Sequence, residues 1–96
     1  MLLISKFKIT GHSMEPTLKQ NELIIISSIP YLFKNPRIND IVAIKSKENK
    51  IFIKRIKKIT KNNYIVLGDN KNDSFDSRNF GPIKKEEIIG KYIYKL

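Results

Sequence analysis

Ser13 lies in a segment whose composition suits a chemical role. Gly11 precedes it by two residues and Pro16 follows it by three, so the backbone around its hydroxyl is constrained. A serine hydroxyl becomes a strong nucleophile only when a neighbouring base takes its proton. Serine is also a common loop residue, so a nucleophilic role for Ser13 depends on a base elsewhere in the chain.

Lys54 has the sequence setting of such a base. It lies within the apolar run from Ile51 to Ile56, and in a strand it would share one face with Phe52 and Ile56. Removal from water lowers the pKa of a lysine, because it disfavours the charged form. A pKa about 3 units below the usual ~10.4 would leave roughly a third of the amine neutral at pH 7. The plainer interpretation is a surface lysine on an edge strand.

His12 is the single histidine and adjoins Ser13. Neighbouring side chains of an extended segment point apart, so its imidazole is poorly placed to take the Ser13 proton. A Ser-His-Asp triad needs that contact. We therefore expect His12 to be an exposed loop residue.

The elements that must position these residues are predicted to be short strands. Isoleucine dominates the apolar residues, and branched residues favour strands. We expect strands over 7–10, 23–26, 41–44, 51–59, 64–67 and 89–94, one helical turn within 84–88, and loops over 11–16, 30–36 and 68–82. Short strands with closely spaced turns predict an all-β fold, a small compact barrel or sandwich of mainly antiparallel strands. The length of 96 residues fits a single domain.

The loop over 68–82 is long and acidic, and it carries two aromatic residues that favour packing against the domain. Loops above about 12–15 residues are usually functional or disordered. The loop does not match a calcium-binding EF-hand loop that starts at Asp69. Such a loop needs glycine at position six and glutamate at position twelve, where this chain has Ser74 and Phe80. Cysteine is absent and only one histidine is present, so we expect no Cys-based or His-rich metal site and no cofactor.

The formal net charge of +10 is compatible with a nucleic acid, an anionic membrane surface or a solvated lysine-rich surface. The lysines are spread from Lys6 to Lys95 without a nucleic-acid motif. We therefore favour the solvated surface and expect no nucleic-acid partner.

No run approaches the ~20 apolar residues of a transmembrane helix, and the N-terminus is too short for a secretory signal. The chain is expected to be cytoplasmic or peripheral at a membrane.

Four segments occur together in an order found in one known family. They are Ser-Met-Glu-Pro-Thr-Leu from Ser13, Asn-Asp-Ile-Val from Asn39, Lys-Arg-Ile from Lys54, and Gly-Asp-Asn from Gly68, followed by Ser-Phe-Asp-Ser-Arg-Asn-Phe-Gly from Ser74. In these segments the chain resembles the type I signal peptidases, the S26-like Ser-Lys peptidases that include mitochondrial inner-membrane peptidases. The likeness covers nearly the whole chain, although Asn39 stands where the family has glycine.

The resemblance implies that residues 1–96 are one signal-peptidase-like catalytic domain. Ser13 would attack the scissile carbonyl and form an acyl-enzyme, with neutral Lys54 as general base. The Ser13 N–H would belong to the oxyanion hole. Some relatives add a hydroxyl two residues before the nucleophile, where this chain has Gly11, so other backbone donors or Thr10 would complete the hole.

The resemblance also implies supporting residues. Ser74 matches the serine that hydrogen-bonds and orients the catalytic lysine, here Lys54. Asp76 and Arg78 match a structural network with Arg55 that holds the last loop against the catalytic strand.

The implied activity is that of a serine endopeptidase that removes an N-terminal leader or signal peptide from a precursor protein. Its substrate would bind as an added strand, for which the strand before Gly11 is one candidate edge. A single hairpin joins Lys54 to Gly68, and the chain shows no N-terminal anchor. This short form is similar to the proteases that mature nickel superoxide dismutase, whose precursor is therefore one candidate partner.

Two other functions compete with this one. A self-cleaving repressor-type domain also uses a Ser-Lys pair, but it carries a DNA-binding domain or a cleavable arm before the nucleophile and lacks the final sequence box. A non-catalytic basic binding module would account for the net charge of +10, although no RNA or DNA motif accompanies it.

Overall fold

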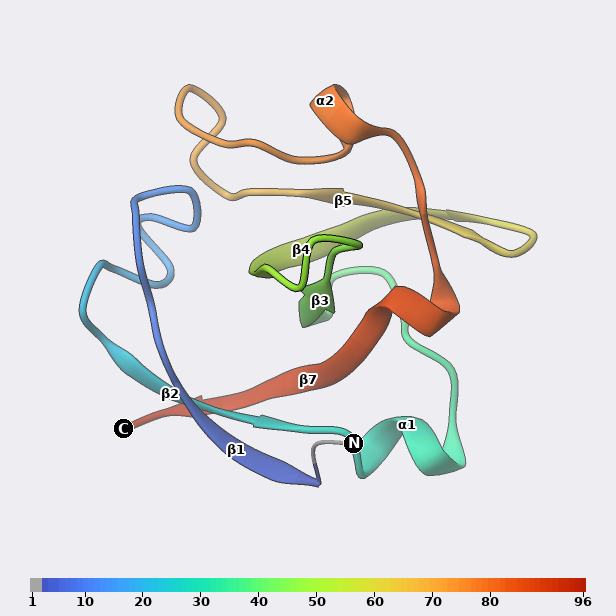
Figure 1. Ribbon diagram of the computed structural model, residues 1–96, viewed down its shortest axis with the longest axis horizontal. Helices are drawn as coiled ribbons and strands as arrows, with labels where there is room; N and C mark the ends of the chain where they lie inside the picture. The colour runs from blue at the N-terminus through green and yellow to red at the C-terminus, as the bar shows by residue number, and fades with distance from the viewer. Residues whose placement is uncertain (1–2) are drawn as a thin grey trace.

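Seven strands form one antiparallel sheet that curls on itself (Figure 1). The structure is a computed structural model that describes residues 3–96. The strands are β1 (Ile4–Lys8), β2 (Leu23–Ser27), β3 (Ile41–Lys45), β4 (Ile51–Thr60), β5 (Asn63–Leu67), β6 (Ile83–Lys84) and β7 (Ile88–Lys95). Their order in the sheet is β1-β2-β7-β3-β4-β5-β6. The prediction of an all-β fold with antiparallel strands is confirmed.

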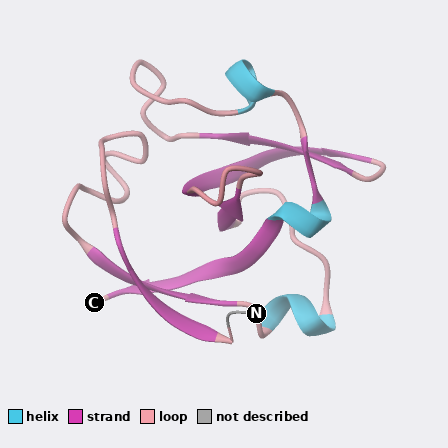
Figure 2. Cartoon of the chain, viewed as in Figure 1, coloured by secondary structure: helices cyan, strands magenta, loops and turns pink. Residues whose placement is uncertain are grey.

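Three short helical segments lie in the connections between strands (Figure 2). They are α1 (Pro30–Phe33), α2 (Ser77–Phe80) and the 3-10 turn η1 (Lys85–Glu87). Among the described residues no helix has the length and apolar character needed to cross a bilayer.

The core is divided into two clusters by β3. Its residues Ile41, Val42, Ala43 and Ile44 are all buried. Because strand side chains alternate, Ile41 and Ala43 join one cluster and Val42 and Ile44 join the other. The curl of the sheet therefore covers both faces of β3. The first cluster also contains Met14 and Leu18, so the loop between β1 and β2 is anchored in the core.

The structure differs from the sequence prediction in several elements. The segment 30–36, expected as a loop, contains α1, which begins with Pro30 at its first turn, where proline is well tolerated. The loop over 68–82 contains α2, and β6 was not predicted. These elements have two to four residues, too few to show a period. β1 spans Ile4–Lys8 rather than the predicted 7–10, so it begins and ends earlier than expected. As an edge strand it leaves much of its side-chain surface in solvent, which weakens the apolar pattern that marks a strand.

Candidate active site

Ser13 lies in the loop between β1 and β2, beside the loop that joins β5 to α2 (Figure 1). The backbone N–H of Asn70 donates to the Ser13 carbonyl at 2.8 Å, and Asn70 Nδ2 donates to the His12 carbonyl at 3.1 Å. Met14 and Leu18 are buried in the core. The loop that carries Ser13 is therefore held by the core on one side and by the second loop on the other.

Lys54 projects from an interior strand toward Ser13. It pairs with Val42 of β3, and the next residue, Arg55, pairs with Leu67 of β5. The interpretation of Lys54 as a surface lysine on an edge strand is therefore wrong. Only 3% of Lys54 is exposed. Its Nζ lies 2.9 Å from Ser13 Oγ.

The setting of Lys54 disfavours its charged form. Burial lowers the pKa of Lys54 from its ordinary value, and the positive charge of Arg78 lowers it further, while the negative charge of Asp76 acts in the opposite direction. The net shift of the Lys54 pKa is downward. The Phe52 ring, whose centroid is 5.9 Å from Nζ, forms part of the apolar surroundings, as the strand alternation predicted. A larger fraction of the amine is therefore neutral than in a solvated lysine.

Ser74 joins Lys54 to a buried carboxylate. Lys54 Nζ lies 3.4 Å from Ser74 Oγ, and Ser74 Oγ donates to Asp76 Oδ2 at 2.7 Å. An ionised carboxylate only accepts hydrogen bonds, so the Ser74 proton points to Asp76. The lone pairs of Ser74 are then free to accept from Lys54, which leaves the lone pair of a neutral amine available toward Ser13.

Asp76 is completely buried but remains ionised. Burial alone would raise its pKa, but hydrogen bonds from the Arg78 side chain, the Gly68 N–H and Ser74 hold the pKa well below its usual range. Arg78 binds both carboxylate oxygens, through Nε and Nη2, at 3.0 Å each. The Gly68 N–H donates to Asp76 at 2.9 Å. The Arg78 N–H donates to Asp76 Oδ1 at 3.1 Å, so Asp76 is also the N-cap of α2. Asp76 thus carries a fixed negative charge behind Ser74.

Arg55 does not join this network, so the prediction of one network with Asp76 and Arg78 is wrong. Arg55 instead binds both carboxylate oxygens of Asp69, at 2.9 and 2.8 Å. Neighbouring residues of a strand point to opposite faces, so the Arg55 side chain lies on the face of β4 opposite to Lys54. The Arg55–Asp69 ion pair joins the last loop to β4, whereas the Asp76–Arg78 ion pair lies within that loop.

Two glycines fit the backbone at the site. A Cβ on Gly68 would overlap Ser74 Oγ and lie 2.5 Å from the Ser13 carbonyl oxygen, so only glycine permits this approach. Gly11 has a φ of +79°, a conformation that other residues rarely adopt. Gly11 was expected to support the site, and its backbone conformation supplies the reason, because it lets the chain turn just before Ser13.

A groove of about 490 Å³ opens onto Ser13 and Lys54. Its walls come from the end of β1, the loop after it, the start of β4 and the loop before α2, and its apolar residues include Phe7, Ile9, Phe52, Ile53 and Phe75. His12 also lies at the groove, but its Nδ1 is 2.8 Å from Glu15 Oε2 and its side chain is half-exposed. The prediction that His12 is an exposed loop residue is confirmed.

Sequence comparisons identify the family. The family model for signal peptidase, peptidase S26, matches residues 1–59 and 57–96. The chain belongs to the signal peptidase family.

Curated members of the signal peptidase family align along most of the chain. Thylakoidal processing peptidase 1 of Arabidopsis thaliana is 26% identical over 91% of this chain and 40% of its own length. Signal peptidase I V of Bacillus subtilis is 25% identical over 88% of this chain and 80% of its own length, and signal peptidase I of Leptolyngbya laminosa is 26% identical over 92% and 66%. The chain thus spans 40 to 80% of the length of these three relatives.

These signal peptidase relatives carry extra residues within the aligned region. The three alignments extend over 134 to 136 residues, although this chain has 96. The two parts of the family match meet at residues 57–59, within β4. This division falls between Lys54 and Gly68, which the sequence predicted to be joined by a single hairpin and which β4 and β5 connect.

The sequence did not reveal the residues that hold the Ser13 loop and the loop after β5 together in this signal peptidase family member. Thr17 Oγ1 donates to Asp69 Oδ2 at 2.6 Å, and Asn70 holds the Ser13 carbonyl at 2.8 Å. All three residues belong to the segments that carry the family resemblance. Their place in those segments was the signal in the sequence that they matter to the site. The contact between them, however, joins residues about 50 positions apart and depends on the fold.

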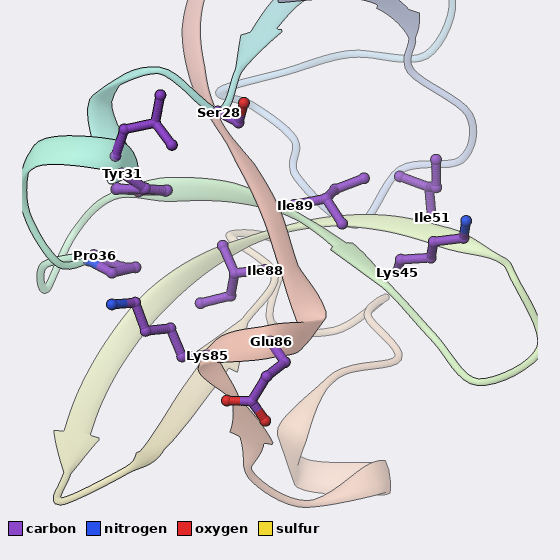
Figure 3. A pocket seen from close by; sticks show the side chains of 10 residues that line it. Ser28, Tyr31, Pro36, Lys45, Ile51, Lys85, Glu86, Ile88 and Ile89 are labelled. Atoms are coloured by element: carbon purple, nitrogen blue, oxygen red, sulfur yellow. The ribbon is translucent and has the colours of Figure 1, made fainter. Parts of the chain in front are cut away.

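A separate hollow of about 520 Å³ lies between α1 and β7 (Figure 3). Ile88 and Ile89 lie between Tyr31 on one side and Ile51 on the other. Ser28 also lines it, and among residues 3–96 Ser28 Oγ is the one buried side-chain nitrogen or oxygen without a hydrogen-bond partner. Neither Ser13 nor Lys54 lines this hollow, so it is distinct from the candidate active site.

Proposed function

We propose that this member of the signal peptidase family is a serine endopeptidase that removes an N-terminal leader or signal peptide with a Ser-Lys dyad. The observation that carries the proposal is the 2.9 Å separation of Lys54 Nζ and Ser13 Oγ at a lysine that is 3% exposed. A nucleophile and a base within hydrogen-bond reach are the signature of activated serine chemistry. The names of the relatives support the same class of activity.

The first half-reaction forms an acyl-enzyme. Neutral Lys54 takes the Ser13 proton while Oγ attacks the scissile carbonyl carbon, and the carbonyl oxygen becomes an oxyanion. The Ser13 N–H, together with other backbone donors or Thr10, would stabilise that charge. The Lys54 ammonium then gives its proton to the leaving amine as the peptide C–N bond breaks.

The second half-reaction releases the acyl group. Lys54, neutral again, takes a proton from a water that attacks the ester carbonyl, and the ammonium returns the proton to Ser13 Oγ as the ester bond breaks. Ser74 orients the amine in both steps, since it accepts from Lys54 and donates to Asp76. The groove that holds the substrate, with walls from both strands that flank the site, suits an extended peptide.

We propose residues 1–96 as one catalytic domain, because the two core clusters share β3. Its partner would be a precursor protein with an N-terminal leader, of which a nickel superoxide dismutase precursor is one candidate. The net charge of +10 suits a peripheral position at an anionic membrane surface.

The test is mass spectrometry of candidate precursors after incubation with the protein. We expect a single cut near the precursor N-terminus, which is lost in Ser13→Ala and Lys54→Met. Lys58→Ala changes an exposed lysine of the same strand and should cleave normally. Equal cleavage by wild type and by both dyad variants would refute the dyad.

The same variants separate the competing functions. A self-cleaving domain would shorten its own chain with a Ser13-dependent rate and leave precursors intact. A basic binding module would bind DNA with an affinity that falls steeply with salt, equally in wild type and Ser13→Ala. Precursor cleavage without either behaviour is the outcome that we expect.

A further inference from the structure

A second hollow continues the candidate active-site groove beyond Phe75. It has a volume of about 690 Å³ and shares Lys50, Phe52 and Phe75 with the groove. Ile44, Phe80, Pro82 and Ile83 complete its apolar wall. The volume lies within the range of sites for small ligands and side chains, about 300–1,000 Å³.

Three aromatic rings lead from the dyad into this hollow. The Phe52 centroid is 5.9 Å from Lys54 Nζ, 6.1 Å from the Phe75 centroid and 6.2 Å from the Phe80 centroid. Phe75 and Phe80 are 5.4 Å apart. Phe75 follows Ser74 directly in the chain, yet 56% of it is exposed. A large apolar side chain next to the dyad is thus left open to a partner.

We propose that this hollow, here called the aromatic subsite, binds a large apolar side chain of the polypeptide substrate, of the size of leucine, methionine or phenylalanine. The proposal rests on the proposed peptidase function and specifies its substrate. Side chains on one face of an extended peptide are about 6.6–6.8 Å apart. This repeat is close to the 6.1 and 6.2 Å ring separations.

A peptide with one side chain at Phe52 would therefore place its next same-face side chain at Phe75 and Phe80. The substrate is favoured over a second copy of the chain because the aromatic subsite is continuous with the groove. The polar rim carries both signs of charge, from Lys47, Lys50, Glu48 and Glu87. A rim with both signs of charge does not favour a charged substrate side chain of either sign. The subsite therefore distinguishes substrate side chains by their apolar size.

The test uses peptides that contain a site cleaved by the wild-type protein and differ at one position. At each position near the cut, kcat/KM is measured for alanine and for phenylalanine. We expect one position at which phenylalanine raises kcat/KM about tenfold, which corresponds to about 1.4 kcal/mol. The preference, taken as the ratio of the two values, should fall to about one in Phe75→Ala and in Phe80→Ala.

Phe33→Ala is the matched control, because Phe33 is an 83% exposed aromatic residue on α1. The preference should remain about tenfold in this variant. Thermal melting checks that Phe80→Ala folds, and the more exposed Phe75 provides an independent variant.

Several outcomes would overturn the inference. Ser13-dependent cleavage with an equal preference in wild type, Phe75→Ala and Phe80→Ala refutes the aromatic subsite and leaves the proposed function intact. A dimer that dissociates in Phe75→Ala would assign the hollow to a second copy. If the wild type cleaves no peptide, the proposed function fails. The subsite is then judged by peptide binding, which must be tighter for phenylalanine than for alanine and lose that difference in Phe75→Ala.

Discussion

Replacing Gly68 by Ala should displace the loop that carries Ser13 and reduce the proposed peptidase activity. An alanine Cβ at this position would lie 2.5 Å from the Ser13 carbonyl oxygen, whereas ordinary van der Waals contact begins at 3.4 Å. The difference requires the Ser13 backbone to move by about 0.9 Å. The Cβ would also overlap Ser74 Oγ, so Ser13, the proposed nucleophile, and Ser74, which is proposed to orient Lys54, are displaced together.

The expected magnitude follows from this displacement. A misplacement of about 1 Å costs on the order of 10²-fold in rate, and overpacking costs about 1–3 kcal/mol of stability. In a domain of this size each kcal/mol lowers the Tm by about 4–8 °C. Gly68→Ala should therefore remain folded at 25 °C while kcat/KM falls about 100-fold.

The assay is kcat/KM on a cleavable precursor peptide, with the Tm followed by circular dichroism. Gly81→Ala is the matched control, since Gly81 has a φ of +84° and open space around its Cβ position. It should lose about 1–3 kcal/mol through backbone strain, because its φ of 84° and ψ of −174° lie in a region that essentially only glycine adopts, and it should keep its activity. The reasoning is refuted if Gly68→Ala retains wild-type kcat/KM, or if Gly81→Ala loses as much activity at equal stability.

Three further predictions concern pH and buried polar groups. Activity should rise with pH through the pKa of Lys54, because the neutral amine is the base, and the midpoint should lie below that of an ordinary lysine; a pH–rate profile that is flat would contradict the assignment. Asp76→Asn should lose about 1.5–3 kcal/mol at pH 7, the range for hydrogen bonds to a charged group, because Arg78, which loses its partner, is 45% exposed. The wild type keeps the Asp76 contribution above the unfolded pKa of about 3.9 and loses it as the pH falls toward the lower folded pKa, so urea denaturation should show the two proteins converging in acid. Ser28→Ala should be neutral or stabilise by about 1 kcal/mol, because the Ser28 hydroxyl has no partner among residues 3–96. Ser27→Ala should destabilise by about 1–2 kcal/mol, since Ser27 Oγ donates to the Leu3 carbonyl and accepts from the Ile29 N–H; equal Tm values for the two serine variants would argue against this difference.

The sequence was sufficient to predict the features that depend on local periodicity. Alternation around Lys54 predicted an apolar face shared with Phe52 and Ile56, and Ile56 is fully buried. Short apolar runs between turns predicted the six longer strands. These features follow from neighbours in the chain, which a single sequence contains.

The contacts between distant segments could not be predicted in the same way. Three acidic residues of the last loop, Asp69, Asp73 and Asp76, were potential partners of Arg55. The choice of Asp69 depends on which face of β4 each part of the loop covers. The family resemblance named the residues but not this pairing. Similarly, Ser28 is an ordinary serine in the sequence, and its unpartnered hydroxyl appears only when α1 and β7 enclose it.

The position of Asp76 explains how the proposed site can hold a lysine whose pKa is lowered but which is still readily protonated. Asp76 reaches Lys54 only through Ser74, by hydrogen bonds of 3.4 and 2.7 Å. A direct ion pair would favour the ammonium in the resting protein and so remove the base. Because the Ser74 hydroxyl separates the two groups, the Asp76 carboxylate raises the pKa of Lys54 by less than burial lowers it. When Lys54 takes the Ser13 proton, Asp76 attracts the new positive charge, and an interaction that is stronger in the transition state than in the ground state accelerates the chemical step.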